Sequence, residues 1–205
     1  MEIKLENIGR RFNREWIFRN INYTFTQDSS YAILGANGSG KSTLLSVIAG
    51  SLTPTEGDLF YYYEGEMIEV ETIFAKLALA APYLELIEEF TLSEVIDFHF
   101  RFKSYKEGLD SSAAMDLLGL AKSKNKPIKF FSSGMKQRTK LVLAFCSDSP
   151  ILLLDEPTSN LDQKGIEWYH ELVNQFTHNR LVIVCSNQEH EYSFCQNQLF
   201  LSDYK

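Results

Sequence analysis

The stretch Gly35-Ala36-Asn37-Gly38-Ser39-Gly40-Lys41-Ser42 decides the fold class of this chain. It fits the pattern G-x-x-x-x-G-K-[ST], and it stands between an apolar segment over residues 31–34 and a helical pattern over 41–49. Glycines let successive backbone N–H groups turn inward, and the start of a helix adds positive potential for an anion. A glycine-rich turn that merely caps a helix is the alternative, which the flanking strand and helix disfavour. We therefore predict a nucleotide site in an α/β fold.

The side chains of this loop suggest how a nucleotide would be bound. Lys41 can reach the outer phosphates as a point charge, and the hydroxyl of Ser42 can be a ligand of Mg²⁺. The residues expected to contact the nucleotide are Gly35, Ala36, Asn37, Gly38, Ser39, Gly40, Lys41, Ser42 and Thr43.

A second candidate site is the acidic end of an apolar strand. Residues 151–154 are continuous apolar residues, and Asp155 and Glu156 follow them directly. In doubly wound sheets, ligands bind at the carboxyl ends of the strands. Asp155 suits the coordination of Mg²⁺, and Glu156 could take a proton from an attacking water or orient it. Two solvated acids at the start of a loop are the alternative, which the nearby phosphate loop makes less attractive.

The rest of the chain reads as strands flanking a helical segment. The capping box Thr91-Leu92-Ser93-Glu94 predicts the start of a helix. Strands are expected over residues 3–5, 16–26, 31–34, 59–63, 67–70, 77–81, 151–154 and 181–184, and helices over 41–49, 91–102, 111–118, 132–146 and 164–178. We predict one domain over 1–205, with a nucleotide-binding core over about 1–90 and 147–205 and a helical subdomain over about 91–146.

Composition narrows the classes of function. A hydrophobic fraction of 44% argues against disorder, and a net charge of -7 argues against binding nucleic acid by phosphate attraction. Cys146, Cys185 and Cys195 lack the spacing of metal ligands, so reduced thiols are expected. No leader is apparent, and the longest apolar runs are strand-sized. We expect a soluble, cytoplasmic protein.

Two further segments carry a resemblance to a known family. Phe131-Ser132-Ser133-Gly134-Met135-Lys136-Gln137-Arg138 resembles the L-S-G-G-Q-x-Q-R signature of ATP-binding-cassette (ABC) ATPases. It departs from that signature at Phe131, Ser133 and Met135. Pro157-Thr158-Ser159-Asn160-Leu161-Asp162 is similar to the D-loop of the same family, with Asn160 where Ala is usual. The resemblance covers essentially the whole chain.

The resemblance implies a P-loop NTPase core of the ABC ATPase type, with an antiparallel β subdomain and an inserted helical subdomain. It also implies ATP and Mg²⁺ as cofactors. In the family the signature faces the phosphate loop of a second cassette in a head-to-tail dimer. Ser132, Ser133 and Gly134 would then contact the nucleotide of the partner, although an ordinary Ser-capped helix would explain one of the serines as well.

Two residues of the family are missing. The Q-loop Gln should follow the strand over 77–81, but residues 76–95 contain no Gln. At the position of the switch His stands Asn187, which can donate a hydrogen bond but cannot become a cation. The expected catalytic residues are Glu156, Lys41 and Asn187, and the expected hydrolysis is slow.

The adenine contact is less well defined. The family places an aromatic residue before the second strand, and Phe12 occupies about that place. Trp16 competes with it, and core packing would explain either ring equally well.

The function that the resemblance implies is the ATP-binding and hydrolysing subunit of an ABC transporter, peripheral on the cytoplasmic face of the membrane. A second cassette and a separate membrane subunit would be its partners, the latter docking near residues 82–90 and the helical subdomain. Two alternatives stay open: a soluble cassette ATPase that works on a protein or RNA assembly, and a nucleotide switch that scarcely hydrolyses ATP. The sequence does not specify the cargo, the direction of transport, or whether the dimer is a homodimer.

Overall fold

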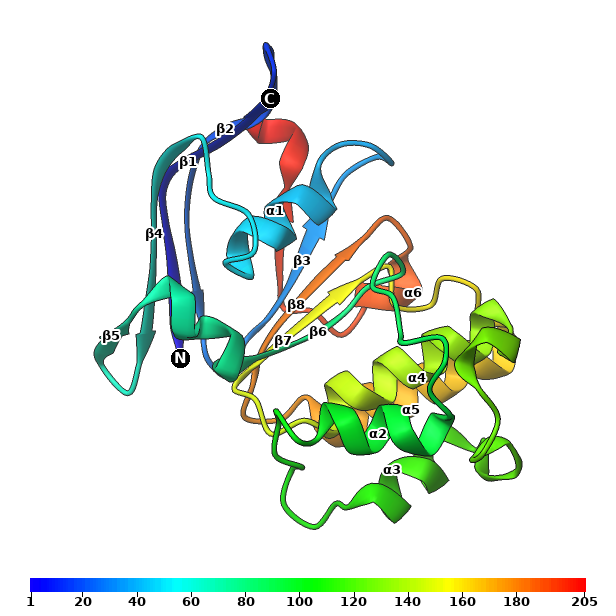
Figure 1. Cartoon of the computed structure of the whole chain (residues 1–205). Coiled ribbons are helices and arrows are strands. Elements are labelled where there is room, and N and C mark those ends of the chain that lie inside the picture. Colours follow the sequence, from blue (N-terminus) through cyan, green and yellow to red (C-terminus); the bar gives the residue numbers. More distant parts are fainter.

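A computed structural model describes residues 1–205, and its centre is a parallel sheet of five strands (Figure 1). The strands are β3 (Ser30–Leu34), β6 (Leu77–Ala80), β7 (Ile151–Asp155), β8 (Leu181–Ser186) and β9 (Asn197–Phe200), in the order β6-β7-β8-β3-β9. The strands β3, β7 and β8 are wholly buried, as expected of apolar strands in a parallel sheet that is covered on both faces.

A second, antiparallel sheet lies beside the first. It contains β1 (Glu2–Phe12), β2 (Glu15–Thr26), β4 (Glu56–Tyr63) and β5 (Glu66–Ile68), in the order β2-β1-β4-β5. Glu64 and Gly65 join β4 and β5 with positive φ angles of 54° and 85°, as a two-residue hairpin turn requires. The expected antiparallel β subdomain is therefore confirmed, with β1 longer than the predicted segment over 3–5.

The helices occupy the predicted segments. They are α1 (Lys41–Ile48), α2 (Leu92–His99), α3 (Ser111–Leu118), α4 (Ser133–Cys146), α5 (Gln163–Phe176) and the short α6 (Glu189–Tyr192). The capping box at Thr91 and Glu94 is confirmed, because each side chain accepts a hydrogen bond from the backbone N–H of the other residue. The helix α2 ends at His99, not near Phe102, and Phe100 follows as its C-cap, with its ring stacked on Tyr105 at 3.5 Å between centroids.

Two hydrophobic cores cover the two faces of the parallel sheet. Alternate residues of β7 point to opposite sides: Leu152 and Leu154 join the core beneath α2–α5, whereas Ile151 and Leu153 join the core that contains α1 and the antiparallel sheet. The helical segment is thus packed onto one face of the sheet and the β subdomain onto the other, as Figure 1 shows. The boundaries of the subdomains stay a prediction.

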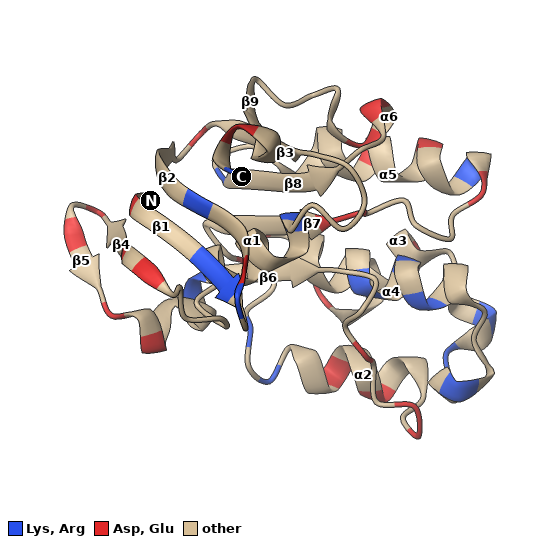
Figure 2. Ribbon diagram, turned by 90° about the horizontal axis from the view of Figure 1, so that it is seen from above, with Lys and Arg blue, Asp and Glu red and all other residues tan.

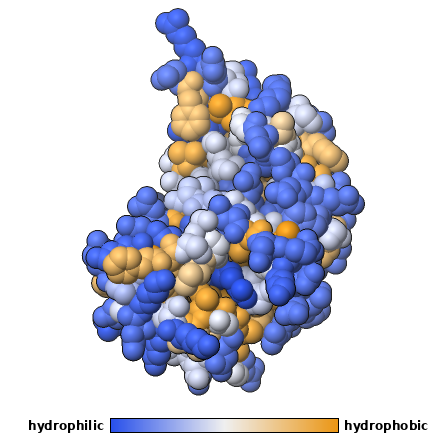
Figure 3. Space-filling model, turned by 90° about the vertical axis from the view of Figure 1, so that its right-hand side faces the viewer, coloured by the Kyte–Doolittle hydropathy of each residue, from blue (hydrophilic) through white to orange (hydrophobic).

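The surface is acidic overall but unevenly charged. Acidic residues gather on β4 and β5, whereas exposed lysines gather in the loop between α3 and α4 (Figure 2); those lysines are Lys122, Lys124, Lys126 and Lys129. Viewed from the side of the helices, hydrophobic side chains emerge as small patches in a mostly hydrophilic surface (Figure 3). None of the helices has the length and hydrophobicity needed to span a bilayer.

Candidate functional site

The phosphate loop leaves β3 at its carboxyl end and leads into α1. Gly40, the residue before α1, has a φ of 102°, and a Cβ there would lie 2.2 Å from Cγ2 of Ile17. Glycine is therefore required twice over, by the left-handed backbone and by the close approach of β2. Residues 36–38 of the loop are exposed, so an anion can approach this turn and the start of α1.

Lys41 lies beneath this loop. Only 5% of the residue is exposed, and its Nζ donates hydrogen bonds to the carbonyl oxygens of Gly35 (2.8 Å) and Ala36 (3.2 Å). A buried ammonium needs such acceptors, because water does not reach it. The loop thus holds its own cation at the place where the outer phosphates of a nucleotide would lie.

Asp155 ends β7 at the same edge of the sheet. It is 2% exposed, and neither carboxylate oxygen has a hydrogen-bond partner. Burial raises the pKa of this carboxyl, and the charge of Glu156 adds to the rise, whereas the nearby hydroxyl of Ser42 and the charge of Lys41 oppose it. A buried acid without partners is costly unless a cation binds it. Asp155 and Ser42 therefore fit a Mg²⁺ ion, which takes oxygen ligands from one or two side chains and from phosphates.

Glu156 is turned away from the strand. Its φ of 40° lies in the left-handed region, which is unusual for a residue with a side chain. Its N–H still donates to the carbonyl oxygen of Cys185 (2.9 Å), so the backbone follows the sheet while the side chain leaves the line of β7. The two acids thus face different surroundings, Asp155 buried and Glu156 partly exposed.

Asn187 stands directly after β8, between the two sites. Its Nδ2 donates to Oδ1 of Asn37 over 2.8 Å, so this side chain reaches the phosphate loop. His190, which lies three residues further on, instead contacts Oγ1 of Thr158 (2.9 Å). The geometry thus places Asn187, and not His190, where a group could meet the end of a triphosphate.

The signature segment begins α4 at some distance along the chain. The hydroxyl of Ser132 accepts a hydrogen bond from the N–H of Met135 (3.2 Å), which is an ordinary helix cap. Ser133 is exposed and has no such task. A Cβ at Gly134 would lie 2.9 Å from the carbonyl oxygen of Asn160, so glycine allows this helix to approach the loop after β7.

The two aromatic candidates for the adenine contact differ in their surroundings. Trp16 has the guanidinium groups of Arg11 and Arg19 over its ring, at 5.2 and 4.5 Å from the centroid. Phe12 is 44% exposed and has one cation nearby, Arg10, at 4.6 Å. The greater freedom of its ring favours Phe12 for stacking on a base.

Tyr83 lies in the region where the Q-loop Gln was expected. It follows β6, which pairs with β7 so that Ala80 lies beside Leu154, close to the acidic strand end. Burial raises the pKa of the Tyr83 phenol, the charge of Asp155 raises it further, and the hydroxyl of Ser46 opposes the rise. The phenol of Tyr83 therefore lies within electrostatic reach of Asp155.

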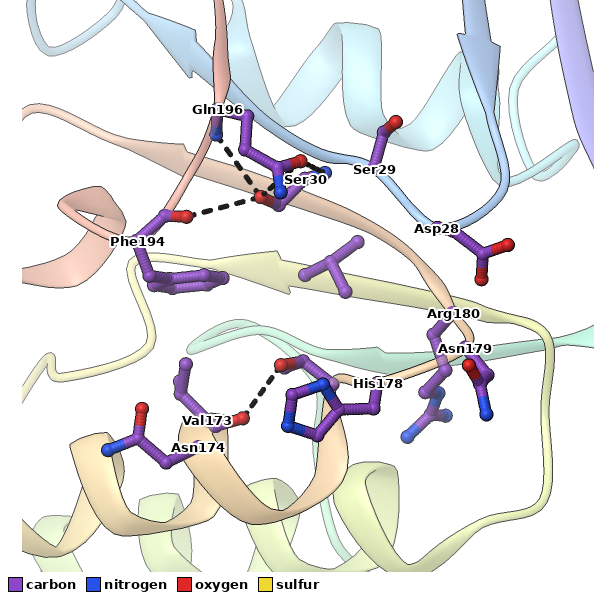
Figure 4. A pocket seen from close by; sticks show the side chains of 12 residues that line it. Asp28, Ser29, Ser30, Val173, Asn174, His178, Asn179, Arg180, Phe194 and Gln196 are labelled. Carbon is purple, nitrogen blue, oxygen red and sulfur yellow. Dashed lines mark hydrogen bonds between the residues drawn. The ribbon is translucent and has the colours of Figure 1, made fainter.

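A polar pocket of about 370 Å³ lies at the opposite, amino end of β3 and β8 (Figure 4). On one side of it the N–H of Ser30 donates to Oε1 of Gln196 (3.1 Å), and the Ser30 hydroxyl donates to the carbonyl oxygen of Phe194 (3.3 Å). Because it lies at the amino end of these strands, it is separate from the site at the carboxyl edge.

Comparison with known proteins identifies the family. The family model described as ABC transporter matches residues 18–159, which include the phosphate loop, the signature segment and the acidic strand end. This chain belongs to the ABC transporter family. The ATP-binding-cassette fold and the resemblance drawn from the signature segment are both confirmed.

Curated relatives and solved structures agree with this assignment. The uncharacterized ABC transporter ATP-binding protein YybJ of Bacillus subtilis is 28% identical over 92% of this chain and 86% of its own length. The lantibiotic transport ATP-binding protein SrtF of Streptococcus pyogenes is 28% identical over 90% and 79%. The bacterial ABC transporter cassette MJ0796, solved as a dimer, is 24% identical over 97% of this chain and 93% of that one, with a TM-score of 0.80. The same cassette is also known as a dimer in a post-hydrolysis state with ADP and phosphate.

Sequence reasoning missed several residues that support this site. Gln137 donates from Nε2 to the carbonyl oxygen of Pro157 (2.8 Å) and ties α4 to the loop after β7. Glu191, which is wholly buried on α6, accepts hydrogen bonds from Thr158 and Ser186. Gln137 matches the signature, but that match does not reveal its contact with Pro157. No local pattern marks Glu191, because its partners lie far away in the sequence.

Proposed function

We propose that this chain is the ATP-binding and hydrolysing subunit of an ABC transporter, which drives a separate membrane subunit through ATP-dependent dimerisation. The observation that carries the proposal is the meeting of the phosphate loop, the buried unpartnered Asp155 and Asn187 at one edge of the parallel sheet. Membership of the family and the transport ATP-binding relatives support it.

Binding of Mg-ATP would use groups that the fold already holds in place. The amides of the loop and the start of α1 would surround the phosphates, and Lys41 would exchange the carbonyl oxygens of Gly35 and Ala36 for phosphate oxygens. Ser42 and Asp155 would hold Mg²⁺, whose charge offsets that of the phosphates. Phe12 would stack on adenine.

Hydrolysis would use Glu156 to orient a water or take its proton. Asn187 would donate a hydrogen bond to the terminal phosphate but could not supply a positive charge. With Asn in place of His and no Gln after β6, we expect slow turnover, because one lost donor to a transition state costs about 10²–10³ in rate.

Dimerisation would complete each site with residues of a second cassette. Ser132, Ser133 and Gly134 lie at the start of α4, where exposed polar groups can meet a phosphate held by a facing chain. ATP would then stabilise the dimer, since its phosphates would be shared between two chains.

A groove on the helical side would receive the membrane subunit. It encloses about 230 Å³ and is mostly apolar; its lining residues are Glu85, Leu86, Ile87, Val95, Phe98, His99, Phe102, Lys103 and Leu143. Ile87 and Phe98 are each 40% exposed, and Phe102 is 73% exposed. An amphipathic helix on the cytoplasmic side of the membrane subunit, with aromatic or aliphatic anchors, fits such a groove.

Nucleotide binding tests the first part of the proposal. We expect Mg-ATP to raise the melting temperature of the purified chain and, in a Glu156→Gln variant, to shift it to a dimer on size-exclusion chromatography. Lys41→Ala should abolish both effects, whereas Lys122→Ala, at an exposed position, should change neither. Absence of Mg-ATP binding by the folded wild-type chain would refute the proposal.

Substitutions in the groove test whether a membrane subunit docks there. Ile87→Glu and Phe98→Glu should leave basal phosphate release within about twofold but prevent copurification with a multi-span membrane protein from native membranes. If no membrane protein copurifies with the wild-type chain although its phosphate release is measurable, a soluble ATPase is the better assignment. Mg-ATP binding without measurable phosphate release would instead indicate the nucleotide switch.

A further inference from the structure

Glu191 is a wholly buried carboxylate to which the proposed chemistry assigns no task. It lies on α6 and is 0% exposed. Its Oε1 accepts hydrogen bonds from the N–H of Thr158 (2.7 Å) and from the hydroxyl of Thr158 (2.5 Å), and its Oε2 accepts one from the hydroxyl of Ser186. One side chain thus joins the loop after β7 to the end of β8.

No cation accompanies this carboxylate. The salt bridges of the chain lie at its surface, and the donors to Glu191 are neutral. Burying a carboxylate in this way costs more free energy than burying an apolar side chain of similar size, even when hydrogen bonds satisfy it. A residue that only filled space at this position would not need the charge.

One partner of Glu191 adjoins the phosphate site. Ser186 is the last residue of β8, and the next residue, Asn187, donates to Asn37 of the phosphate loop (2.8 Å). A nucleotide that displaced Asn37 or bound Asn187 would therefore act directly on the backbone that carries Ser186.

The other partner, Thr158, lies near the start of the loop over residues 157–162. This loop is fixed on its far side to α4, through the hydrogen bond from Gln137 to the carbonyl oxygen of Pro157 (2.8 Å). Asn160 of the same loop lies against Gly134 at the start of α4. Glu191 thus stands in an unbroken series of contacts from the phosphate loop to the signature segment.

His190 completes the arrangement around Thr158. The Thr158 hydroxyl has one proton, which it donates to Glu191, so the contact of His190 Nε2 with the same oxygen (2.9 Å) requires the imidazole to be the donor. Thr158 therefore donates through both its N–H and its hydroxyl, and every group in the cluster has a partner.

We infer that Glu191 is a positioning residue that couples the phosphate site to the loop over 157–162 and, through that loop, to the signature segment. The ligand in this inference rests on the proposed function; the linkage between the two loops rests on the contacts alone. Removal of the carboxylate should free the loop while leaving the phosphate site itself intact.

Hydrogen exchange of the full chain tests the inference, with Mg-AMP-PNP as the probe. In the wild type we expect the probe to slow exchange both in the phosphate loop and in residues 157–162. In Glu191→Ala, residues 157–162 should exchange at least tenfold faster without the probe and should no longer respond to it. Affinity for the probe should stay within about threefold, because none of the groups expected to bind the phosphates is changed.

Matched variants separate coupling from general loss of stability. Glu189→Ala removes an exposed acid from the same helix and should behave as the wild type. Glu191→Gln keeps one acceptor for Thr158 and should restore part of the response. If Glu191→Ala does not fold, Ser186→Ala can be used instead, because, of the hydrogen bonds to Glu191, it removes only the one from Ser186. In that variant residues 157–162 should no longer respond to Mg-AMP-PNP, whereas the phosphate loop should still be protected by it.

Two results would overturn the inference: an unchanged response of residues 157–162 in Glu191→Ala or Ser186→Ala, or a lower melting temperature with the response retained, which would mean a purely structural role. Failure of the proposed function would look different. In that case the probe would protect nothing in the wild type, while Glu191→Ala would still accelerate exchange of residues 157–162.

Discussion

The side-chain amide of Asn187 donates to the amide oxygen of Asn37 over 2.8 Å and joins the end of β8 to the phosphate loop. By the resemblance to the family, Asn187 is expected at the position of the switch histidine. The amide can replace that histidine as a hydrogen-bond donor but not as a source of charge. The contact uses one of the two N–H donors of the Asn187 amide, which leaves the second for a phosphate.

This relationship predicts the effect of restoring the histidine. We expect Asn187→His to raise steady-state phosphate release at least tenfold, because an imidazolium stabilises developing negative charge better than an amide. Asn187→Ala should lower it by about 10²–10³, since a donor to the transition state is lost. Gln188→Ala, at the exposed position next to Asn187, serves as the control and should not lower it. Equal turnover in Asn187→Ala and the wild type would show that Asn187 has no catalytic role.

Replacing Asp155 is expected to change the stability of the chain and its binding of Mg²⁺ in opposite directions. Both of its oxygens are buried without partners, so Asp155→Asn should raise the free energy of unfolding without metal by about 1–2 kcal/mol. The same variant should lose the extra stabilisation that Mg²⁺ gives in the presence of ATP. Chemical denaturation with and without Mg-ATP measures both effects.

Glu156→Gln provides the control for that prediction. It leaves Asp155 in place, and Glu156 is partly exposed, so binding of Mg-ATP should persist while phosphate release is lost. A variant Asp155→Asn that was less stable than the wild type and kept its response to Mg²⁺ would contradict the assignment of Asp155 as the metal ligand.

The phosphate loop and the acidic strand end could be predicted because their chemistry depends on neighbours in sequence. Gly40 and Lys41 must be adjacent for the turn and the cation to coincide, and Asp155 must end its strand to face the ligand. Glu191 could not be predicted, because Thr158 and Ser186 meet it only after β7 and β8 have paired and α6 has packed behind them.

The sequence did not predict the end of β1 or the strand β9, because in both places tertiary pairing forms a strand that the local residue pattern does not favour. The strand β1 continues to Phe12, although Arg10 and Arg11 interrupt the alternation, because shifts in register beyond Leu5 accommodate them. The strand β9 has two polar residues among four and shows no signal of its own. It forms because β3 offers an open edge for parallel pairing.

Arg180 lies far from the nucleotide site, and its replacement is expected to lower the stability of the chain strongly. It is 2% exposed, and its guanidinium donates to the carbonyl oxygens that end α4 and the loop after it, those of Ala144, Phe145, Ser147 and Ser149. Burial lowers its pKa to about 10, so the group is charged at neutral pH. Arg180→Met would leave these carbonyls without partners and should lower the free energy of unfolding by about 3 kcal/mol.

The exposed Arg101 offers a matched control for this change. Urea denaturation of Arg101→Met should differ from the wild type by less than about 0.5 kcal/mol. If Arg180→Met were equally harmless, the carbonyls at the end of α4 would have found other donors, and the guanidinium would not be the cap that stabilises this helix.

The burial of His99 leads us to expect that the stability of the chain depends on pH. Its Nε2 lies 2.9 Å from the hydroxyl of Ser147, and burial, with a smaller contribution from the charge of Lys103, lowers its pKa from 6.5 to about 4. Because the folded state holds the neutral imidazole, the unfolded state binds the extra proton first as the pH falls. Stability from this group is complete above about pH 6.5 and is lost progressively towards pH 4, by about 2 kcal/mol at pH 4.5.

Urea denaturation at pH 7.0 and 4.5 measures this effect, and His99→Gln isolates it, because glutamine does not titrate. The difference in unfolding free energy between the two pH values should be about 2 kcal/mol smaller in His99→Gln than in the wild type. An identical pH dependence in His99→Gln and the wild type would mean that His99 is protonated as easily in the folded chain as in the unfolded one.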